Sequence, residues 1–372
     1  MASACKKRRF VSHGGDVWGF SRKYKIPLEK VLDFSGPINF LGASPKAVEA
    51  IKQYSKLVRF YPDPNPVELK TEIARYVGHG VKPENIILGN GSIELIYMVP
   101  GAFQPGFKTV IPVPSFTEYE KATLRLCGEP VFVQLPDDFA LDVEAIKKAV
   151  TADTRMMCVC NPHSPSGRLY DRETLLDLVD FCHKKNVVFS VDENYIEFTG
   201  KVDDITLAGY VKQYENLFVI RSVTKFYGMP GIRFGYGIAS EAFIDTLETV
   251  RQPWSINSLA GFATLAAFSD TEFIENSKRF VAEERALLSK MLTDIGGLRV
   301  FPSETNFLLV KILNSKVTST GLKEELSKEG LLIRDCSTFV GLDNSFFRVT
   351  VRSAEDNQKL VATLKEKIKS MS

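Results

Sequence analysis

The sequence is poor in metal-binding residues and lacks a cysteine pattern typical of disulfides. It contains six cysteines and four histidines in 372 residues. No pair of histidines has the H-x-x-x-H spacing of a metal site, so we expect no metal centre. The cysteines are scattered, without the spacing of a disulfide framework or a zinc site, and we expect reduced, buried thiols. They are Cys5, Cys127, Cys158, Cys160, Cys182 and Cys336.

Long apolar segments and an excess of one charge are also missing. No apolar run approaches the ~20 residues of a membrane-spanning helix, and MASACKKRRF at the start is not followed by the apolar core of a signal peptide. The formal net charge is +2, and basic residues are interspersed with acidic ones, so no basic face indicates nucleic-acid binding. We therefore expect a cytoplasmic protein with neither a nucleic-acid nor a membrane partner.

What the sequence does contain is a regular alternation of apolar runs and amphipathic stretches between residues 67 and 240. Runs such as IILGN, KTVIPV, VVFSVDE and LFVIRS alternate with segments such as RETLLDLVDFCHKKN, which predicts an α/β fold with a mainly parallel sheet and crossover helices. Beyond Glu241 the pattern changes to long helices and then short strands. We expect an N-terminal arm (1–40), a large domain (41–245) and a small α+β domain (246–372).

A lysine follows one of the predicted buried strands. Lys225 lies in RSVTKFYGMPGIRFGYG, just after LFVIRS, at the sheet edge where α/β proteins place their chemistry. A solvated surface lysine is the simplest alternative. If Lys225 instead binds a cofactor covalently, a phosphate site should lie nearby, and Ser222 and Arg233 offer a hydroxyl and a planar cation for it. In IILGNGSIELIY, Gly91 and Ser92 begin a helix that could bind an anion, although, taken alone, a tight turn with a serine cap is the better explanation of this motif.

Polar residues also end two other predicted strands. Asp192 ends the apolar strand in VVFSVDENY, and a carboxylate at this edge needs a cationic partner, such as a protonated ring nitrogen. Tyr195 and Asn161, the latter in RMMCVCNPHSPSG, are suited to bind an oxygen on the same ring. Taken singly, Asp192 could be a helix cap and Asn161 a turn former.

Together these motifs, in this order and spacing, resemble the fold-type I pyridoxal phosphate (PLP) enzymes of the aminotransferase superfamily over nearly the whole chain. The resemblance implies that Lys225 binds the PLP aldehyde and that Asp192 contacts the pyridine nitrogen. It also implies a stacking role for Phe116 and a homodimer in which Tyr61, in FYPDP, reaches the partner's cofactor phosphate. The remaining implied PLP contacts are Asn161 and Tyr195 at the ring oxygen and Gly91, Ser92, Ser222 and Arg233 at the phosphate.

Two arginines narrow the resemblance to enzymes of phosphorylated amino acids. Arg348, in FFRVTV, matches the family arginine that binds the substrate carboxylate. Arg334, in LLIRDC, matches the arginine that holds a substrate phosphate in histidinol-phosphate aminotransferases and in the similar threonine-phosphate decarboxylases. The resemblance therefore implies a phosphorylated amino acid as the substrate.

The N-terminus resembles the decarboxylases more than the aminotransferases. SHGGDVWGF and LDFSGPINFLG are similar to the decarboxylase signatures, which assigns His13 to the substrate phosphate and Asn39 to the substrate carboxylate. The sequence departs from the usual SANINP at SGPINF, so the loop around Asn39 can shape the pocket differently. QPWSIN, and Arg352 where aminotransferases more often have glycine, support the same branch.

The expected reaction is PLP-dependent decarboxylation of L-threonine O-3-phosphate to (R)-1-aminopropan-2-ol O-2-phosphate, a precursor of the cobamide nucleotide loop. L-serine O-phosphate would give ethanolamine phosphate by the same chemistry. A histidinol-phosphate-type aminotransferase is the main alternative, since it shares the lysine, the aspartate and both arginines. A protein that binds PLP without catalysis, or an α/β binding module without PLP, is a second alternative.

Overall fold

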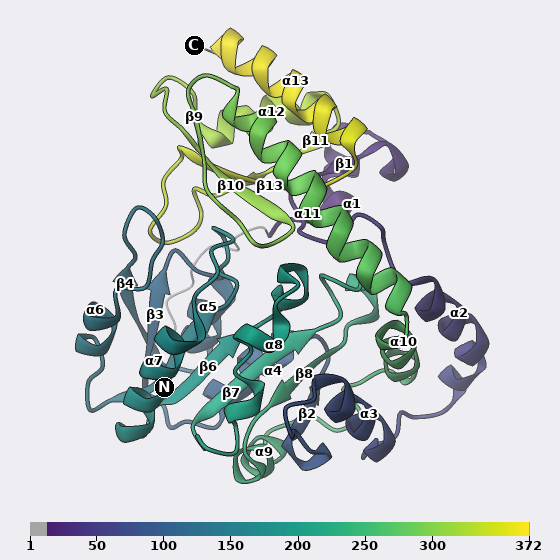
Figure 1. The fold of residues 1–372 in the computed structure, drawn as a ribbon, viewed down its shortest axis with the longest axis vertical. Helices are drawn as coiled ribbons and strands as arrows, with labels where there is room; N and C mark the ends of the chain where they lie inside the picture. Colours follow the sequence, from purple (N-terminus) through teal and green to yellow (C-terminus); the bar gives the residue numbers. More distant parts are fainter. Residues whose placement is uncertain (1–12, 372) are drawn as a thin grey trace.

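The computed structural model describes residues 13–371, and its main element is a seven-stranded sheet (Figure 1). The strand order is β2-β8-β7-β6-β5-β3-β4. Only β8 runs antiparallel to its neighbours, and the other pairs are parallel, which confirms the predicted mainly parallel sheet. The strands are β2 (Ile86–Gly89), β3 (Lys108–Val113), β4 (Glu129–Gln134), β5 (Thr154–Cys160), β6 (Val188–Asp192), β7 (Leu217–Ser222) and β8 (Gly235–Ile238).

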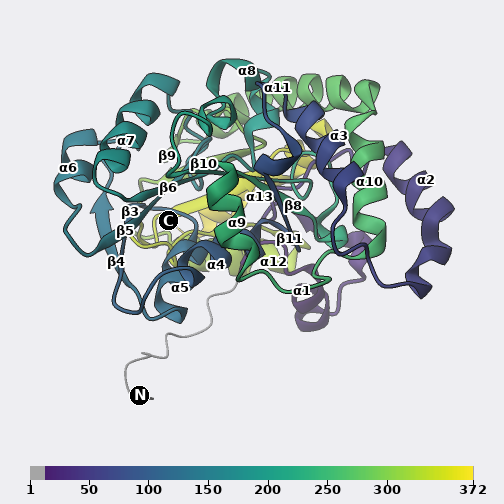
Figure 2. The same ribbon diagram turned by 90° about the horizontal axis from the view of Figure 1, so that it is seen from below.

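Helices lie on both sides of this sheet (Figure 2). Several begin with a polar side chain that accepts a hydrogen bond from the first turn, as Asp171 does for α7 and Asn257 for α10, and such caps satisfy otherwise unpaired N–H groups. The helices of this part are α2 (Pro45–Tyr54), α3 (Val67–Val77), α4 (Ser92–Gly101), α5 (Thr117–Arg125), α6 (Val143–Lys148), α7 (Arg172–Lys184), α8 (Val202–Ile205), α9 (Glu241–Glu248) and α10 (Ser258–Phe268).

A smaller four-stranded sheet forms the second part of the molecule, in the order β12-β13-β10-β9. Its residues alternate: Leu308 and Val310 pack against the helices on one face, while Phe307, Leu309 and Lys311 are on the other, as expected for strands. The elements are α11 (Thr271–Thr293), β9 (Leu298–Val300), β10 (Phe307–Ile312), α12 (Ser319–Lys328), β12 (Arg334–Asp335), β13 (Phe346–Thr350) and α13 (Ala354–Met371).

The long helix α11 connects the two parts and runs from beside α10 to the small sheet (Figure 1). Phe273 and Val281, in its first half, belong to the core of the large sheet, whereas Leu288 and Leu292 belong to the core of the small one. Helix α10 packs on α2 of the large part. We therefore propose that the boundary between the two domains lies within α11, later in the chain than the expected boundary at residue 246.

The N-terminal arm crosses to the small domain. After α1 (Val17–Tyr24), β1 (Leu32–Asp33) pairs in parallel with β11 (Leu331–Leu332). The arm therefore packs on the small domain through this pairing. Cys5 and the KKRR segment lie outside the described residues. Within residues 13–371, no helix combines the length and apolarity required to cross a membrane.

Candidate active site

The lysine predicted to bind the cofactor lies at the carboxyl end of β7, in the wall of a cavity of about 160 Å³. The backbone carbonyl of Lys225 accepts hydrogen bonds from the N–H groups of Asn39 (3.0 Å) and Gly228 (3.3 Å), which fix this turn. Loss of hydration lowers the pKa of Lys225 to about 8, and the charge of Arg348 adds to this effect, while Asp192 opposes it. A neutral amine, which is the nucleophilic form, is therefore accessible close to neutral pH.

Asp192 ends β6 and lines the same cavity. Its Oδ2 accepts a hydrogen bond from the Tyr119 hydroxyl (2.7 Å), and its Oδ1 accepts one from the N–H of Asn194 (3.0 Å). Burial raises the pKa of Asp192 despite these bonds. No ion pair with this carboxylate is present among residues 13–371, so a cationic ring nitrogen would supply the charge that this buried group lacks.

The predicted phosphate site forms where α4 begins. Gly91 has φ +77° and lies against the Arg233 guanidinium, so a Cβ at this position would collide with that cation. Ser92, Ser222 and Arg233 all line the cavity. Unpaired N–H groups of the first turn of α4, together with a guanidinium, are suited to a phosphate dianion.

Two aromatic side chains border the space between the lysine and the phosphate site. Phe116 caps α5 and makes an edge contact with Tyr119 at a centroid separation of 5.7 Å. Tyr195 is buried, and its ring packs edge-on against Phe307 at 5.2 Å. Burial raises the pKa of Tyr195 well above that of a free tyrosine, so its phenol is a hydrogen-bond donor at neutral pH. Taken together, the residues present fit PLP.

Asn161 lies at the end of β5 beside Asp192, whose carbonyl accepts a hydrogen bond from the Asn161 N–H (2.9 Å). Its amide oxygen accepts a bond from the Tyr170 N–H (2.8 Å), and its amide nitrogen donates to the Tyr170 carbonyl (3.2 Å). An amide nitrogen has two hydrogens, so one donor remains for a ring oxygen. The predicted contact between Asn161 and the cofactor stays a prediction.

The two predicted substrate arginines are direct cross-strand partners in β12 and β13. Arg334 and Arg348 are each 5% exposed. Arg348 donates to the Ser164 hydroxyl (3.3 Å) and to the Ser35 carbonyl (3.4 Å), and its Nε has no partner among the described residues. Like charges at opposite positions of a sheet repel each other, so this buried pair favours one or two anions between the domains.

His13 is close both to Phe116, which lines the cavity around Lys225, and to Arg334. Its Nε2 is 2.7 Å from Glu118 Oε1, its ring lies 6.0 Å from that of Phe116, and it lines a cavity of about 200 Å³ together with Arg334. Burial would raise the pKa of Glu118, but hydrogen bonds from His13, Lys121 and Tyr97 outweigh this and lower it to about 2. The ionised Glu118 therefore anchors the imidazole near Phe116.

Two predicted residues lie elsewhere or have other partners. Asn39 donates both amide hydrogens, to the Phe226 carbonyl and the Ser277 hydroxyl (2.8 Å each). A contact with a substrate carboxylate would require Asn39 to give up one of these bonds, so its predicted role is untested and its present one is to hold the Lys225 segment. Tyr61 is 83% exposed and does not line this cavity, which leaves its predicted action across a dimer open.

Several residues of the site were not predicted. Tyr119 and Asn194 hold Asp192, and Ser164 binds Arg348. A weak signal existed, because Asn194 and Ser164 are within the VDENY and CNPHSPSG motifs. Tyr119 is three residues after Phe116 on α5, and only the packing of that helix on β3 and β4 brings its hydroxyl to Asp192.

A lysine and an aspartate at neighbouring strand ends, with a glycine turn and an arginine beside them, define a fold-type I PLP-dependent enzyme. The chain belongs to the aminotransferase class I and II family, whose model matches residues 30–364. Enzymes of this family depend on PLP.

Known relatives include both decarboxylases and aminotransferases. The chain is 38% identical to a "putative threonine-phosphate decarboxylase" of Caldanaerobacter subterraneus subsp. tengcongensis, over 97% of this chain and 95% of that one. It is similar to the crystal structure of histidinol-phosphate aminotransferase from Clostridium acetobutylicum (TM-score 0.85, 33% identity, 91% and 100% covered). L-threonine-O-3-phosphate decarboxylase from Porphyromonas gingivalis is similar too (TM-score 0.81, 27% identity, 91% and 100% covered).

Proposed function

We propose that the protein decarboxylates a phosphorylated amino acid, namely L-threonine O-3-phosphate, to (R)-1-aminopropan-2-ol O-2-phosphate and CO2. One observation carries the proposal: His13 and Arg334 line one cavity, and the His13 ring is 6.0 Å from that of Phe116, which lines the cavity around Lys225. The relationship to the Caldanaerobacter protein supports it. The product would serve assembly of the cobamide nucleotide loop, and L-serine O-phosphate is a second candidate substrate.

In this proposal the buried arginines divide the substrate's two anionic groups between them. Arg348, next to Ser164 and close enough to Lys225 to lower its pKa, would bind the carboxylate. Arg334, on the neighbouring strand and 5.0 Å from the Phe339 ring, would bind the phosphate together with His13. The two anions would offset the repulsion between the cross-strand cations.

PLP, when bound, supplies an electron sink for the bond that breaks at Cα. The bond activated is the one held perpendicular to the ring plane. The chain's own residues determine which bond this is, because they orient the substrate. Two anchors on the substrate fix its rotation about Cα, so the carboxylate can be held in the reactive direction. Lys225, whose pKa is about 8, is suited to return a proton to Cα after CO2 leaves.

The test is to incubate the PLP-loaded protein with L-threonine O-3-phosphate and, separately, with L-serine O-phosphate. CO2 release and the amine product would be followed by mass spectrometry. Release from either substrate supports the proposal and ranks the two, which differ by one methyl group, worth about 1–3 kcal/mol in a hydrophobic pocket. No release from both, with the cofactor bound, would refute it.

A histidinol-phosphate-type aminotransferase is the second candidate. The structural similarity to the Clostridium enzyme, at 33% identity, favours it. It predicts amino transfer from histidinol phosphate to 2-oxoglutarate, measured as glutamate formation. Lys225 would then move a proton from Cα instead of returning one there. Absence of glutamate under saturating PLP would exclude the aminotransferase function.

We also propose that the enzyme is a homodimer in which Tyr61 contacts the partner's cofactor phosphate. The Tyr61 ring contacts the Trp254 ring in a tilted arrangement with a centroid separation of 5.2 Å, and both side chains are at least half exposed. They lie near an apolar groove of about 370 Å³, to which Phe60, Tyr61 and Phe262 contribute. Exposed aromatic clusters of this kind are typical of protein interfaces.

A further inference from the structure

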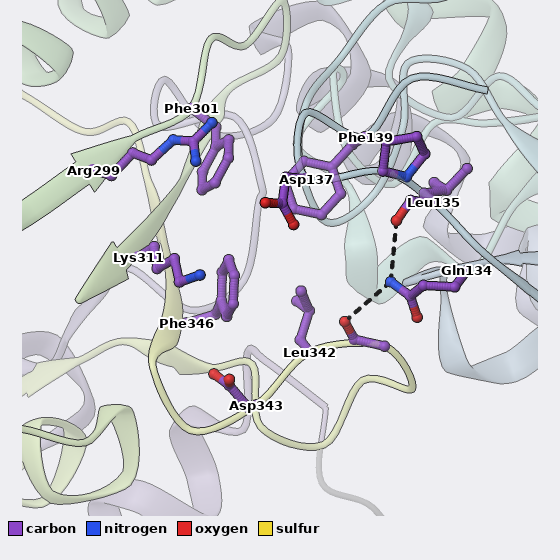
Figure 3. A pocket seen from close by; sticks show the side chains of 12 residues that line it. Gln134, Leu135, Asp137, Phe139, Arg299, Phe301, Lys311, Leu342, Asp343 and Phe346 are labelled. Atoms are coloured by element: carbon purple, nitrogen blue, oxygen red, sulfur yellow. Dashed lines mark hydrogen bonds between the residues drawn. The ribbon is translucent and has the colours of Figure 1, made fainter. Parts of the chain in front are cut away.

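A further cavity, of about 370 Å³, lies between the two domains. On the large domain the wall is formed by Gln134, the last residue of β4, and by residues 135–137 and Phe139 after it. The opposite wall is formed by residues in or next to β9, β10 and β13 and by the loop 341–343 (Figure 3). It shares no lining residue with the cavity around Lys225. Cofactor binding therefore leaves this space unexplained.

Two cations project into this cavity from directly opposite positions of the small sheet. Arg299 of β9 pairs with Lys311 of β10 in the strand register. Figure 3 shows both side chains extending beside the aromatic rings of the small-domain wall. Neither forms an ion pair with a carboxylate within 4.0 Å in the part of the chain that the structure describes. Like charges facing each other across strands cost stability unless an anion lies between them.

The same sheet face already carries one such pair. Arg334 and Arg348 face each other at the active-site end, and Leu309 and Phe346 separate them from Lys311 within the sheet. At the active-site end the paired cations would bind the anionic groups of the proposed substrate, so this comparison rests on the proposed function. A second pair on the same face, in a separate cavity, indicates a second anion.

The surroundings of the cations define the rest of the ligand. The rings of Phe301 and Phe346 are stacked at 6.1 Å, with the Arg299 guanidinium 4.7 Å from the first and the Lys311 ammonium 5.1 Å from the second. Leu342 completes this apolar shelf. Such a surface favours a flat or apolar group attached to the anion.

Two carboxylates also line the cavity and restrict the ligand's charge. Asp343 accepts hydrogen bonds from the N–H (2.8 Å) and hydroxyl of Ser345, which lower its pKa, as does the charge of Lys311 to a smaller extent. Asp137 lies on the opposite wall. Both carboxylates would repel additional anionic groups, so a ligand with a single anionic end suits this cavity better than one with several.

We propose that this interdomain cavity is a second binding site, for a small organic anion with one phosphate or carboxylate and an apolar body. Its anionic end binds Arg299 and Lys311, and its apolar body rests on Phe301 and Phe346. Because it touches both domains, the ligand ties the 341–343 loop to the segment after β4. Gln134 already donates a hydrogen bond to the Gly341 carbonyl across this gap (3.5 Å).

The test uses phenyl phosphate as the probe and isothermal titration calorimetry on the PLP-loaded protein. Arg334→Ala serves as the background, since it removes the proposed active-site affinity for phosphate. The Arg334→Ala protein should bind one phenyl phosphate per chain. Adding Lys311→Gln or Arg299→Gln should lower this affinity about tenfold. Lys359→Gln, which removes an exposed cation on α13, behind the other face of the sheet, should leave the affinity unchanged.

The variants need not disturb folding, because Arg299 is exposed and Lys311 half-buried; equal melting temperatures would verify this. Lys311→Arg should restore binding, and phenol, which lacks the anion, should bind at least tenfold more weakly than phenyl phosphate. Affinity that is the same in Lys311→Gln as in its background, or equal affinity for phenol, would overturn the proposal. So would a failure of phenyl phosphate to bind the Arg334→Ala protein.

Discussion

The partial burial of Lys225 controls how fast the protein can capture its cofactor. Its pKa is lowered to about 8, first by lost hydration and then by Arg348. Below this pH the amine is mostly protonated and cannot attack an aldehyde. We predict that the rate of PLP capture by the apoprotein rises about tenfold per pH unit below 8 and levels off above it. Stopped-flow absorbance near ~420 nm measures this directly.

Lys225→Ala is the control and should show no such band while remaining folded. A rate that keeps rising to the ordinary lysine pKa near ~10.4 would contradict the lowered value. The same shift affects stability, because the unfolded chain binds a proton between about pH 8 and the ordinary pKa while the folded chain does not. Apoprotein stability should therefore rise with pH over this window.

The proposed role of Arg334 separates recognition of the substrate from recognition of the cofactor. It lies on β12, outside the cavity around Lys225. Arg334→Ala should raise KM for a phosphorylated substrate by about 10- to 100-fold, the value of a desolvated charge-assisted pair, with little change in PLP affinity. His13→Ala should act in the same direction but less strongly, since His13 is exposed. Equal losses for substrate and PLP would refute the assignment.

At the scale of elements, the ends of parallel strands were the most predictable part of the site. Apolar runs fix where β5, β6 and β7 end, and parallel pairing brings Asn161, Asp192 and the segment of Lys225 to one edge. Tyr119 was not predictable in this way, because its contact with Asp192 depends on how α5 packs. The hydrogen bonds that Asn39 makes with Phe226 and Ser277 depend on the course of a loop, which a sequence pattern does not define.

The turn between β2 and α4 gives a prediction at this scale. Gly91 and Gly106 both have positive φ (77° and 92°), but only at Gly91 would a Cβ meet the Arg233 guanidinium, and nothing lies within 4 Å at Gly106. Both alanine variants carry backbone strain of order 1–3 kcal/mol, because a side chain rarely adopts a positive φ. Gly91→Ala should in addition weaken PLP binding at least tenfold, measured by fluorescence titration. Similar PLP affinity in the two variants would show that PLP binding does not depend on the close approach of the Arg233 guanidinium to Gly91.

At the scale of the whole molecule, the substrate side of the site is assembled from three segments distant in the chain. His13 of the arm, Glu118 of α5 and Arg334 of β12 belong to the arm, the large domain and the small domain. Pairing of β1 with β11 holds the arm against the small domain. Motifs identified His13 and Arg334 singly, whereas Glu118 was not predicted, and the meeting of the three depends on the relative position of two domains, which no local pattern encodes.

The proposed dimer leads to a complementation experiment on the whole assembly. If Tyr61 reaches the partner's cofactor, each site contains Lys225 of one chain and Tyr61 of the other. Lys225→Ala and Tyr61→Ala then affect residues that different chains contribute to one site. In a heterodimer of the two variants, one site then carries both lesions and the other carries neither. Unfolding and refolding an equimolar mixture gives half heterodimers, so about one quarter of all sites should bind PLP with native affinity, as measured by titration at ~420 nm.

If Tyr61 instead contacts the cofactor of its own chain, the mixing experiment should give a different result. Each heterodimer would then contain one site without Lys225 and one without Tyr61, and no site of native affinity would appear on mixing. Each variant refolded alone serves as the control, and analytical ultracentrifugation reports whether dimers form at all. Tyr61 stands 83% exposed beside Trp254, so truncating it should not unfold the chain, and a missing native-affinity fraction would count directly against the shared site.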